Sequence, residues 1–219
     1  MISEARIVFA LSLAAACCGT AAETPRAAWM SGGYGVMSHW VYARYTGNQA
    51  DVDGPVERFD LDAFLRDFDS TGADWFIFTI GQNTGGYASP NAEIERLCGP
   101  GHCPKRDLAG EIAAALHARG KRFIIYLPGD ALVPSIAKGM RYTPDDLHRH
   151  AFQTNWTGVI REWAVRFGKN LDGWWFDGMG RGRFPHGFDA PLWEAAARAG
   201  NPGCAVAFNH SMLSTYEGK

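Results

Sequence analysis

The segment Trp75-Phe-Ile-Phe-Thr-Ile80 is a continuous apolar run with the length of one β-strand. A strand without a polar face is buried on both sides, which is typical of parallel sheets covered by helices. The segments Arg122-Phe-Ile-Ile-Tyr-Leu127 and Gly173-Trp-Trp-Phe-Asp177 have the same character. Together these three segments predict a parallel β-sheet at the centre of the protein.

Helical patterns alternate with these strands along the chain. Leu61, Phe64, Leu65 and Phe68 recur on one face of a predicted helix over 59–72. The other predicted elements are helices over 107–120, 152–167 and 192–199 and strands over 34–40 and 205–209. This alternation of strands and helices indicates an α/β fold with one parallel sheet.

The pattern favours a parallel (β/α)8-type barrel, the TIM barrel, over a doubly wound sheet. A doubly wound sheet usually carries a Gly-rich phosphate turn after its first strand, and the chain has no G-x-G-x-x-G motif there. Five strands are recognisable, whereas a full barrel takes roughly 250 residues. We therefore expect one barrel domain over 23–219, truncated after about five βα units and incomplete at its C-terminus.

The composition excludes several classes of protein. The chain has 219 residues, of which 47% are hydrophobic and 20% charged, so it is not a disordered chain, a collagen or a coiled coil. Its formal net charge of −2 provides no basic field, and we expect no nucleic-acid partner. The sequence leaves the oligomeric state open.

The N-terminal 22 residues have the pattern of a secretory signal peptide. An apolar run over 7–18 is too short to span a membrane, and Thr20-Ala-Ala22 offers a cleavage site with small residues. A lipid anchor on Cys17 or Cys18 and a retained buried helix are the alternatives. We expect a secreted or periplasmic protein without a membrane span.

Cys98 and Cys103 flank a turn-rich loop that contains His102. In an oxidising compartment the two cysteines could form a disulfide, and free thiols are the alternative. A zinc site needs more ligands than His102 adds, so we expect no metal.

Polar or aromatic side chains stand where each predicted strand ends. In a barrel these positions converge on one face, where active sites are built. The candidate substrate-binding residues at these ends, in chain order, are His39, Trp40, Gln82, Asn83, Asp130 and Asn209. For His39 and Trp40 a place in the core is the alternative. For Gln82 and Asn83 it is a role in shaping their loop, and for Asp130 it is capping of the next segment.

Asp177 ends the strand Gly173-Trp-Trp-Phe-Asp177 and is the candidate catalytic residue. A carboxylate at the end of an apolar strand is costly unless it is paired or used. Gly178 and Gly180 leave open space beside it, and Trp175 is placed to line the same site. Such a carboxylate suits nucleophilic attack on an anomeric carbon, and capping of the following loop is the alternative.

Several of these motifs resemble, in order, those of the α-L-fucosidases of glycoside hydrolase family 29. Gly35-Val-Met-Ser-His39-Trp40 is similar to the family's opening strand, and Gly72-Ala-Asp-Trp75 is similar to the start of its second unit. Gly173-Trp-Trp-Phe-Asp177-Gly178 resembles the motif that holds the family's nucleophilic Asp, and Asn209 resembles an Asn that closes its fifth strand.

The resemblance implies a (β/α)8-like domain, a retaining mechanism and no cofactor. Gln82 and Asn83 stand where the family has sugar-binding His residues, and their amides can still donate to and accept from hydroxyls. No motif identifies the general acid, for which Asp130 and Glu217 are the candidates. We expect a retaining glycoside hydrolase that cleaves a terminal sugar from a glycan, or alternatively a non-catalytic carbohydrate-binding protein on the same fold.

Overall fold

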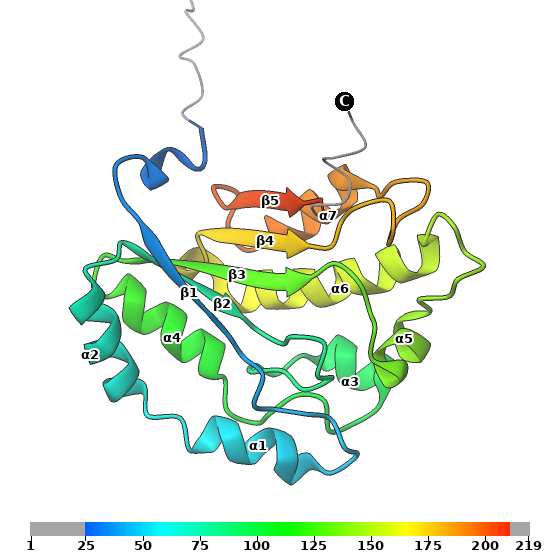
Figure 1. Ribbon diagram of the computed structural model, residues 1–219, viewed down its shortest axis with the longest axis horizontal. Helices are drawn as coiled ribbons and strands as arrows, with labels where there is room; N and C mark the ends of the chain where they lie inside the picture. The colour runs from blue at the N-terminus through cyan, green and yellow to red at the C-terminus, as the bar shows by residue number, and fades with distance from the viewer. Residues whose placement is uncertain (1–24, 211–219) are drawn as a thin grey trace, which may run out of the picture.

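The computed structural model describes residues 25–210, which contain a five-stranded parallel sheet with the strand order β1-β2-β3-β4-β5 (Figure 1). The strands are β1 (Gly35–His39), β2 (Trp75–Thr79), β3 (Arg122–Pro128), β4 (Gly173–Asp177) and β5 (Ala205–Asn209). Each strand pairs with its neighbours in the sequence, as in the wall of a (β/α) barrel, whereas a doubly wound sheet reverses its order. The prediction of an α/β fold with five barrel-type strands is confirmed. The predicted signal peptide over 1–22 lies outside the described residues.

Helices connect the strands. They are α1 (Gln49–Glu57), α2 (Leu61–Thr71), α3 (Ala92–Cys98), α4 (Leu108–His117), α5 (Pro134–Met140), α6 (His150–Phe167) and α7 (Ala190–Ala197), with short 3₁₀ turns η1 (Ala28–Met30) and η2 (Gly168–Asn170). The four predicted helices are present as α2, α4, α6 and α7. The sequence patterns missed α1, which contains Gly54 and Pro55, and the helices α3 and α5, whose seven residues are too few to show a clear period.

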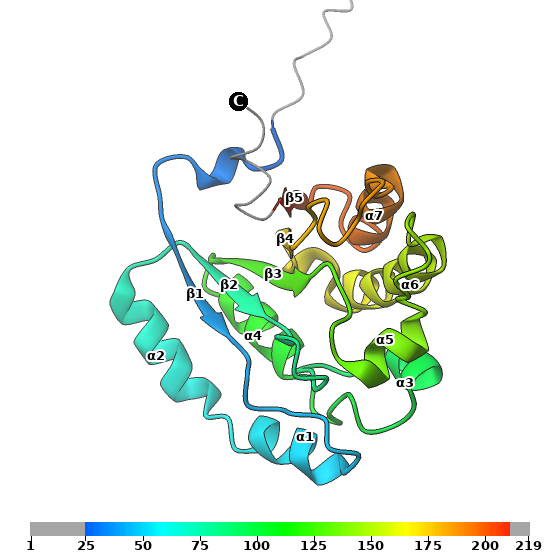
Figure 2. The same cartoon turned by 45° about the vertical axis from the view of Figure 1, so that its right-hand side comes forward.

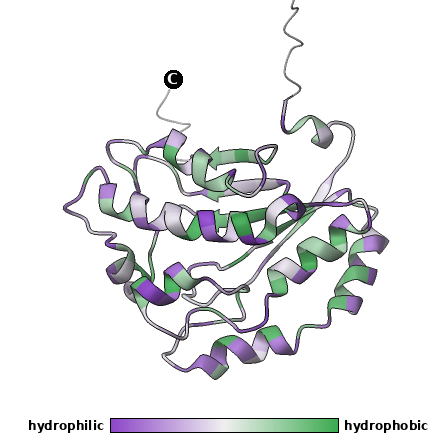
Figure 3. Cartoon of the chain, turned by 180° about the vertical axis from the view of Figure 1, so that it is seen from behind, coloured by the Kyte–Doolittle hydropathy of each residue, from purple (hydrophilic) through white to green (hydrophobic). Residues whose placement is uncertain are grey.

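The helices lie along one side of the sheet in an arc (Figure 2). Alternate strand residues such as Phe76 and Phe78 point to this side and join the large hydrophobic core beneath the helices. Seen from behind, these helices carry hydrophobic and hydrophilic residues in alternation, as amphipathic helices do (Figure 3). The opposite face has a smaller apolar cluster around Trp75 and Ile77, against which the N-terminal Trp29 packs.

Helix α6 is the main cover of the sheet. Six large apolar residues at a spacing of three to four along this helix are all buried, namely Phe152, Trp156, Val159, Ile160, Trp163 and Phe167. Asp107 caps the start of α4, because its carboxylate accepts a hydrogen bond of 3.0 Å from the Gly110 backbone nitrogen. The candidate disulfide is absent, since Cys98 and Cys103 are free thiols.

No helix within residues 25–210 combines the length and the apolar composition that crossing a bilayer requires.

We predict that Trp163→Ala lowers the free energy of unfolding by about 3–5 kcal/mol, because it empties a large buried site. The Trp163 indole is fully buried, packs on Tyr87 with ring centroids 5.4 Å apart, and donates to the Pro90 carbonyl at 3.0 Å. Urea unfolding measures the loss. Val165→Ala on the same helix is the matched control and should change stability by less than about 0.5 kcal/mol, since Val165 is 60% exposed. Equal losses in the two variants contradict the assigned packing.

Candidate active site

The strand register brings polar side chains together at the carboxyl edge of the sheet. His39, Thr79, Tyr126 and Trp175 lie in one row across neighbouring strands β1 to β4. Two residues further along, Asp177 of β4 pairs with Asn209 of β5. Because side chains alternate along a strand, these two rows face the same side of the sheet, away from the helices.

Asp177 is held by hydrogen bonds to both of its carboxylate oxygens. The Tyr126 hydroxyl donates to Oδ2, and the Asn209 side-chain amide donates to Oδ1 at 2.6 Å. Donors on both oxygens fix the orientation of the carboxylate. The carboxylate remains half-buried at the mouth of a cavity, so it is accessible to a ligand.

Tyr126 is a site residue that the sequence patterns missed. Burial and the neighbouring Asp177 carboxylate raise the pKa of the phenol, so the hydroxyl stays protonated and remains a donor at neutral pH. A signal was present, because Tyr126 is the one hydroxyl-bearing residue in the segment Phe123–Leu127, and a buried tyrosine hydroxyl usually finds a partner.

A cavity of about 400 Å³ opens in front of Asp177. Its volume falls in the range of small-molecule sites, roughly 300–1,000 Å³. Its polar lining residues are Gln82, Asn83, Tyr126, Asp130, Asp177 and Arg183. Gly178, Gly180 and Gly182 line the same cavity and leave it open, as the sequence suggested for the first two.

Asp130 lies in this cavity beside Arg183. The Arg183 Nε atom is 2.7 Å from the Asp130 Oδ2 atom, and Asp130 is only 6% exposed. Burial raises the pKa of the Asp130 carboxyl and the negative charge of Asp177 adds to this, whereas Arg183 opposes it, and the net shift is upward. Asp130 therefore accepts a proton more readily than an exposed aspartate does.

The segment that carries Gln82 and Asn83 is fixed against neighbouring loops. Asn83 adopts a left-handed conformation with φ of 47°, which asparagine tolerates better than most residues. Close behind it, the His102 Nδ1–H donates to the Gly85 carbonyl at 2.6 Å, and Tyr45 stacks on the His102 ring at 3.7 Å. Burial lowers the pKa of His102, which keeps this ring neutral.

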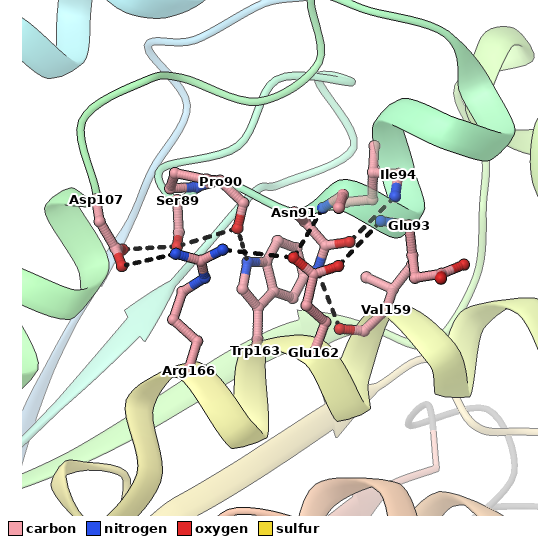
Figure 4. A network of polar contacts seen from close by, with 11 residues as sticks. Ser89, Pro90, Asn91, Glu93, Ile94, Asp107, Val159, Glu162, Trp163 and Arg166 are labelled. Atoms are coloured by element: carbon pink, nitrogen blue, oxygen red, sulfur yellow. Dashed lines mark hydrogen bonds and ion pairs between the residues drawn. The ribbon is translucent and has the colours of Figure 1, made fainter.

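A polar network anchors the rest of this long β2 loop to α6 (Figure 4). The Glu162 carboxylate accepts from the backbone nitrogens of Ala92 and Glu93 at 2.8 and 2.9 Å, which caps the start of α3. Asn91 donates to the Val159 carbonyl at 3.1 Å. These bonds hold the end of the loop after β2 against α6. Together with the contacts of His102, they fix the loop that carries the amides of Gln82 and Asn83.

The sequence-predicted residues separate into three groups in the structure. Gln82, Asn83, Asp130, Asp177 and Asn209 lie at the cavity or bond to a residue that lines it.

His39 and Trp175 lie beside the cavity in the Tyr126 row. The His39 Nδ1 atom is 3.1 Å from the Thr79 hydroxyl, and the rings of His39 and Trp175 are 5.4 and 6.0 Å from the ring of Tyr126. The rings of His39 and Trp175 therefore pack on Tyr126 from strands β1 and β4.

The placement of Trp40 in the substrate site is wrong. Its side chain is 3% exposed and packs in the core against Phe59 and Phe78, with ring centroids 6.1 Å away in both cases. The reason is that side chains alternate along a strand. His39 faces the side of the sheet away from the helices, so the next residue, Trp40, points to the helix-covered side.

Within residues 25–210, no group of three or more His, Cys, Asp or Glu side chains is arranged to hold a metal ion.

Comparison with known proteins shows a likeness of fold. No protein-family model matches the chain, and no curated protein matches it. Among solved structures, the endo-fucoidan hydrolase MfFcnA4 of glycoside hydrolase family 107 is similar, with 22% identity, a TM-score of 0.65 and coverage of 85% of this chain. The α-L-fucosidase AlfC from Lactobacillus casei, in complex with its α-L-fucose product, has 17% identity, a TM-score of 0.56 and coverage of 84%.

The chain spans 33% of the length of MfFcnA4 and 70% of that of AlfC. At these identities the likeness shows the fold alone, which this chain shares with part of each of these two enzymes. It extends to family 107 as well as to α-L-fucosidases, so membership of family 29 is not confirmed.

We predict that Asp130→Asn is more stable than the wild type at pH 7 and equally stable at pH 3. The pKa of Asp130 is raised on folding, so its ionisation weakens the folded state as pH rises above the unfolded pKa. At pH 3 the wild-type carboxyl is protonated in both states, and the difference disappears. Urea unfolding at the two pH values measures it, and a variant that loses stability at pH 7 contradicts the prediction.

Proposed function

We propose that the protein is an exported retaining glycoside hydrolase, similar in action to α-L-fucosidases, that cleaves a terminal sugar from a glycan. Asp177 is the nucleophile. The observation that carries the proposal is the Asp177 carboxylate, which Tyr126 and Asn209 orient at a sugar-sized cavity. Attack on the anomeric carbon requires a carboxylate of this kind.

The lining of the cavity supports a neutral sugar ring as the ligand. Gln82 and Asn83 offer amide groups that donate to and accept from hydroxyls. The likeness of fold to fucoidan hydrolases and α-L-fucosidases supports the same class of substrate. In the first step the Asp177 oxygen bonds to the anomeric carbon while the bond to the leaving oxygen breaks, and water then releases the sugar.

A carbohydrate-binding protein without turnover is the second candidate. It is favoured by Gln82 and Asn83, which line the cavity and stand where the resembled family has sugar-binding His residues. Isothermal titration with L-fucose beside a hydrolysis assay distinguishes the two, since binding without turnover selects the second.

We predict that Asp177→Asn lowers kcat/KM on 2-chloro-4-nitrophenyl α-L-fucoside by roughly 10⁴-fold or more, because an amide cannot form the glycosyl-enzyme bond. Binding of L-fucose should remain, since the shape of the cavity is kept. Release of the chromophore and isothermal titration measure the two effects.

Asp67→Asn is the matched control for this substitution. It neutralises an exposed carboxylate on α2, outside the residues that line the cavity, and should leave kcat/KM unchanged. Full turnover in Asp177→Asn removes Asp177 from the mechanism.

A further inference from the structure

Two carboxyl groups share the cavity in front of the sheet. Among the described residues that line it, Asp130 and Asp177 are the ones with a carboxyl side chain. A retaining glycosidase uses two carboxyl groups, one as the nucleophile and one as the general acid and base. Asp177 is the proposed nucleophile, so Asp130 is the candidate for the general acid and base.

The backbone ties Asp130 closely to Asp177. The Gly129 nitrogen donates to the Asp177 carbonyl at 2.6 Å, so the residue before Asp130 is bonded directly to the end of β4. A side chain at Gly129 would meet the Asp177 carbonyl oxygen at 2.9 Å and Met179, so this approach requires glycine. Asp130 is therefore presented from a rigid support beside Asp177.

The Asp130 carboxyl also points toward the neighbourhood of Asp177. A Cβ atom placed on Gly178, the residue after Asp177, would lie 3.9 Å from the Asp130 Oδ2 atom. Gly178 has a φ of +75°, a conformation that glycine adopts without strain, and its missing side chain leaves this space open.

The surroundings of the two carboxyl groups differ in the way that separate acid and nucleophile roles require. Asp177 accepts from two donors and is half-buried. Asp130 is almost fully buried and forms an ion pair with Arg183, whose side chain is 45% exposed. Two carboxyl groups in unlike environments divide into a proton donor and an ionised nucleophile.

We infer that Asp130 is the general acid and base of this site, an assignment that rests on the proposed function. In the first step its proton goes to the leaving oxygen, which keeps the electron pair of the broken glycosidic bond. In the second step the Asp130 carboxylate takes a proton from water as the water oxygen bonds to the anomeric carbon. The Asp177–sugar bond breaks, and its electron pair returns to Asp177.

The first test compares Asp130→Asn on two substrates that differ in their need for an acid. On 2-chloro-4-nitrophenyl α-L-fucoside, whose leaving group departs without a proton, formation of the glycosyl-enzyme should slow by less than about 10-fold. On phenyl α-L-fucoside, which needs the proton, kcat/KM should fall by roughly 10²–10⁴-fold.

The second readout is rescue by sodium azide. Azide attacks the glycosyl-enzyme without a base, so it should restore turnover of Asp130→Asn on the activated substrate and give a fucosyl azide with the anomeric configuration of the substrate. A merely structural role of Asp130 predicts neither this product nor the dependence on the leaving group.

Arg183→Gln is the matched second variant, because it keeps the Asp130 carboxyl and removes its ion pair. The ionisable groups that face Asp130 are Arg183, Asp177, Tyr126 and Tyr142. Loss of the Arg183 charge raises the pKa of Asp130, so the acid stays protonated to higher pH. The basic limb of the kcat/KM profile should move to higher pH, without rescue by azide.

The outcomes separate this assignment from the proposed function. If the wild type turns over, Asp177→Asn does not, and Asp130→Asn loses activity equally on both substrates without azide rescue, the assignment of Asp130 is wrong while the nucleophile stands. An Asp130→Asn protein with unchanged kinetics also overturns it. A wild type without turnover on either fucoside overturns the proposed function and this assignment together.

Discussion

The parallel register of β3, β4 and β5 is the constraint on which the site depends. It sets Asp177 opposite Asn209 and one row beyond Tyr126, so that one carboxylate receives a donor from each neighbouring strand. A slip of one residue in β4 would turn Asp177 toward the helices and bring Phe176 to the cavity, because side chains alternate along a strand. The large aromatic core behind the sheet opposes that slip, because Phe176 packs there edge-on against Trp193 of α7, with ring centroids 5.2 Å apart.

Residues at the ends of strands could be predicted from the sequence because a parallel sheet brings its carboxyl ends to one edge. Asp177, Asn209, Gln82 and Asn83 were identified in this way. Trp40 shows the limit of that reasoning, since the end of a strand fixes the edge but not the face. Trp40 is one residue past His39, so its side chain points to the opposite face of the sheet. Which of the two faces a given residue of β1 takes depends on how β1 pairs with β2, and the sequence of β1 alone does not reveal this.

Contacts between distant segments lay beyond the sequence patterns for a similar reason. Tyr126 acquires its role from Asp177, which is 51 residues away in the chain. The loop after β2 is held in place by hydrogen bonds to α6, in which Asn91 donates to the Val159 carbonyl and the Glu162 carboxylate accepts from the start of α3. The partners in these bonds are about 70 residues apart in the sequence. Short-range periodicity identifies the elements that take part in such contacts. It cannot identify the partners, which depend on how the elements pack.

Asp130 and Arg183 show that burying a carboxyl group in the cavity costs stability. The half-exposed Arg183 does not fully offset the cost of burying the Asp130 charge. The raised pKa of Asp130 reflects the part of that cost that remains. The fold tolerates it because the hydrogen bond from the Gly129 nitrogen to the Asp177 carbonyl holds the backbone next to Asp130 against the end of β4. Packing alone gives no reason to place a buried carboxyl group with a raised pKa beside a second carboxylate in one cavity, which supports the separate roles proposed for Asp130 and Asp177.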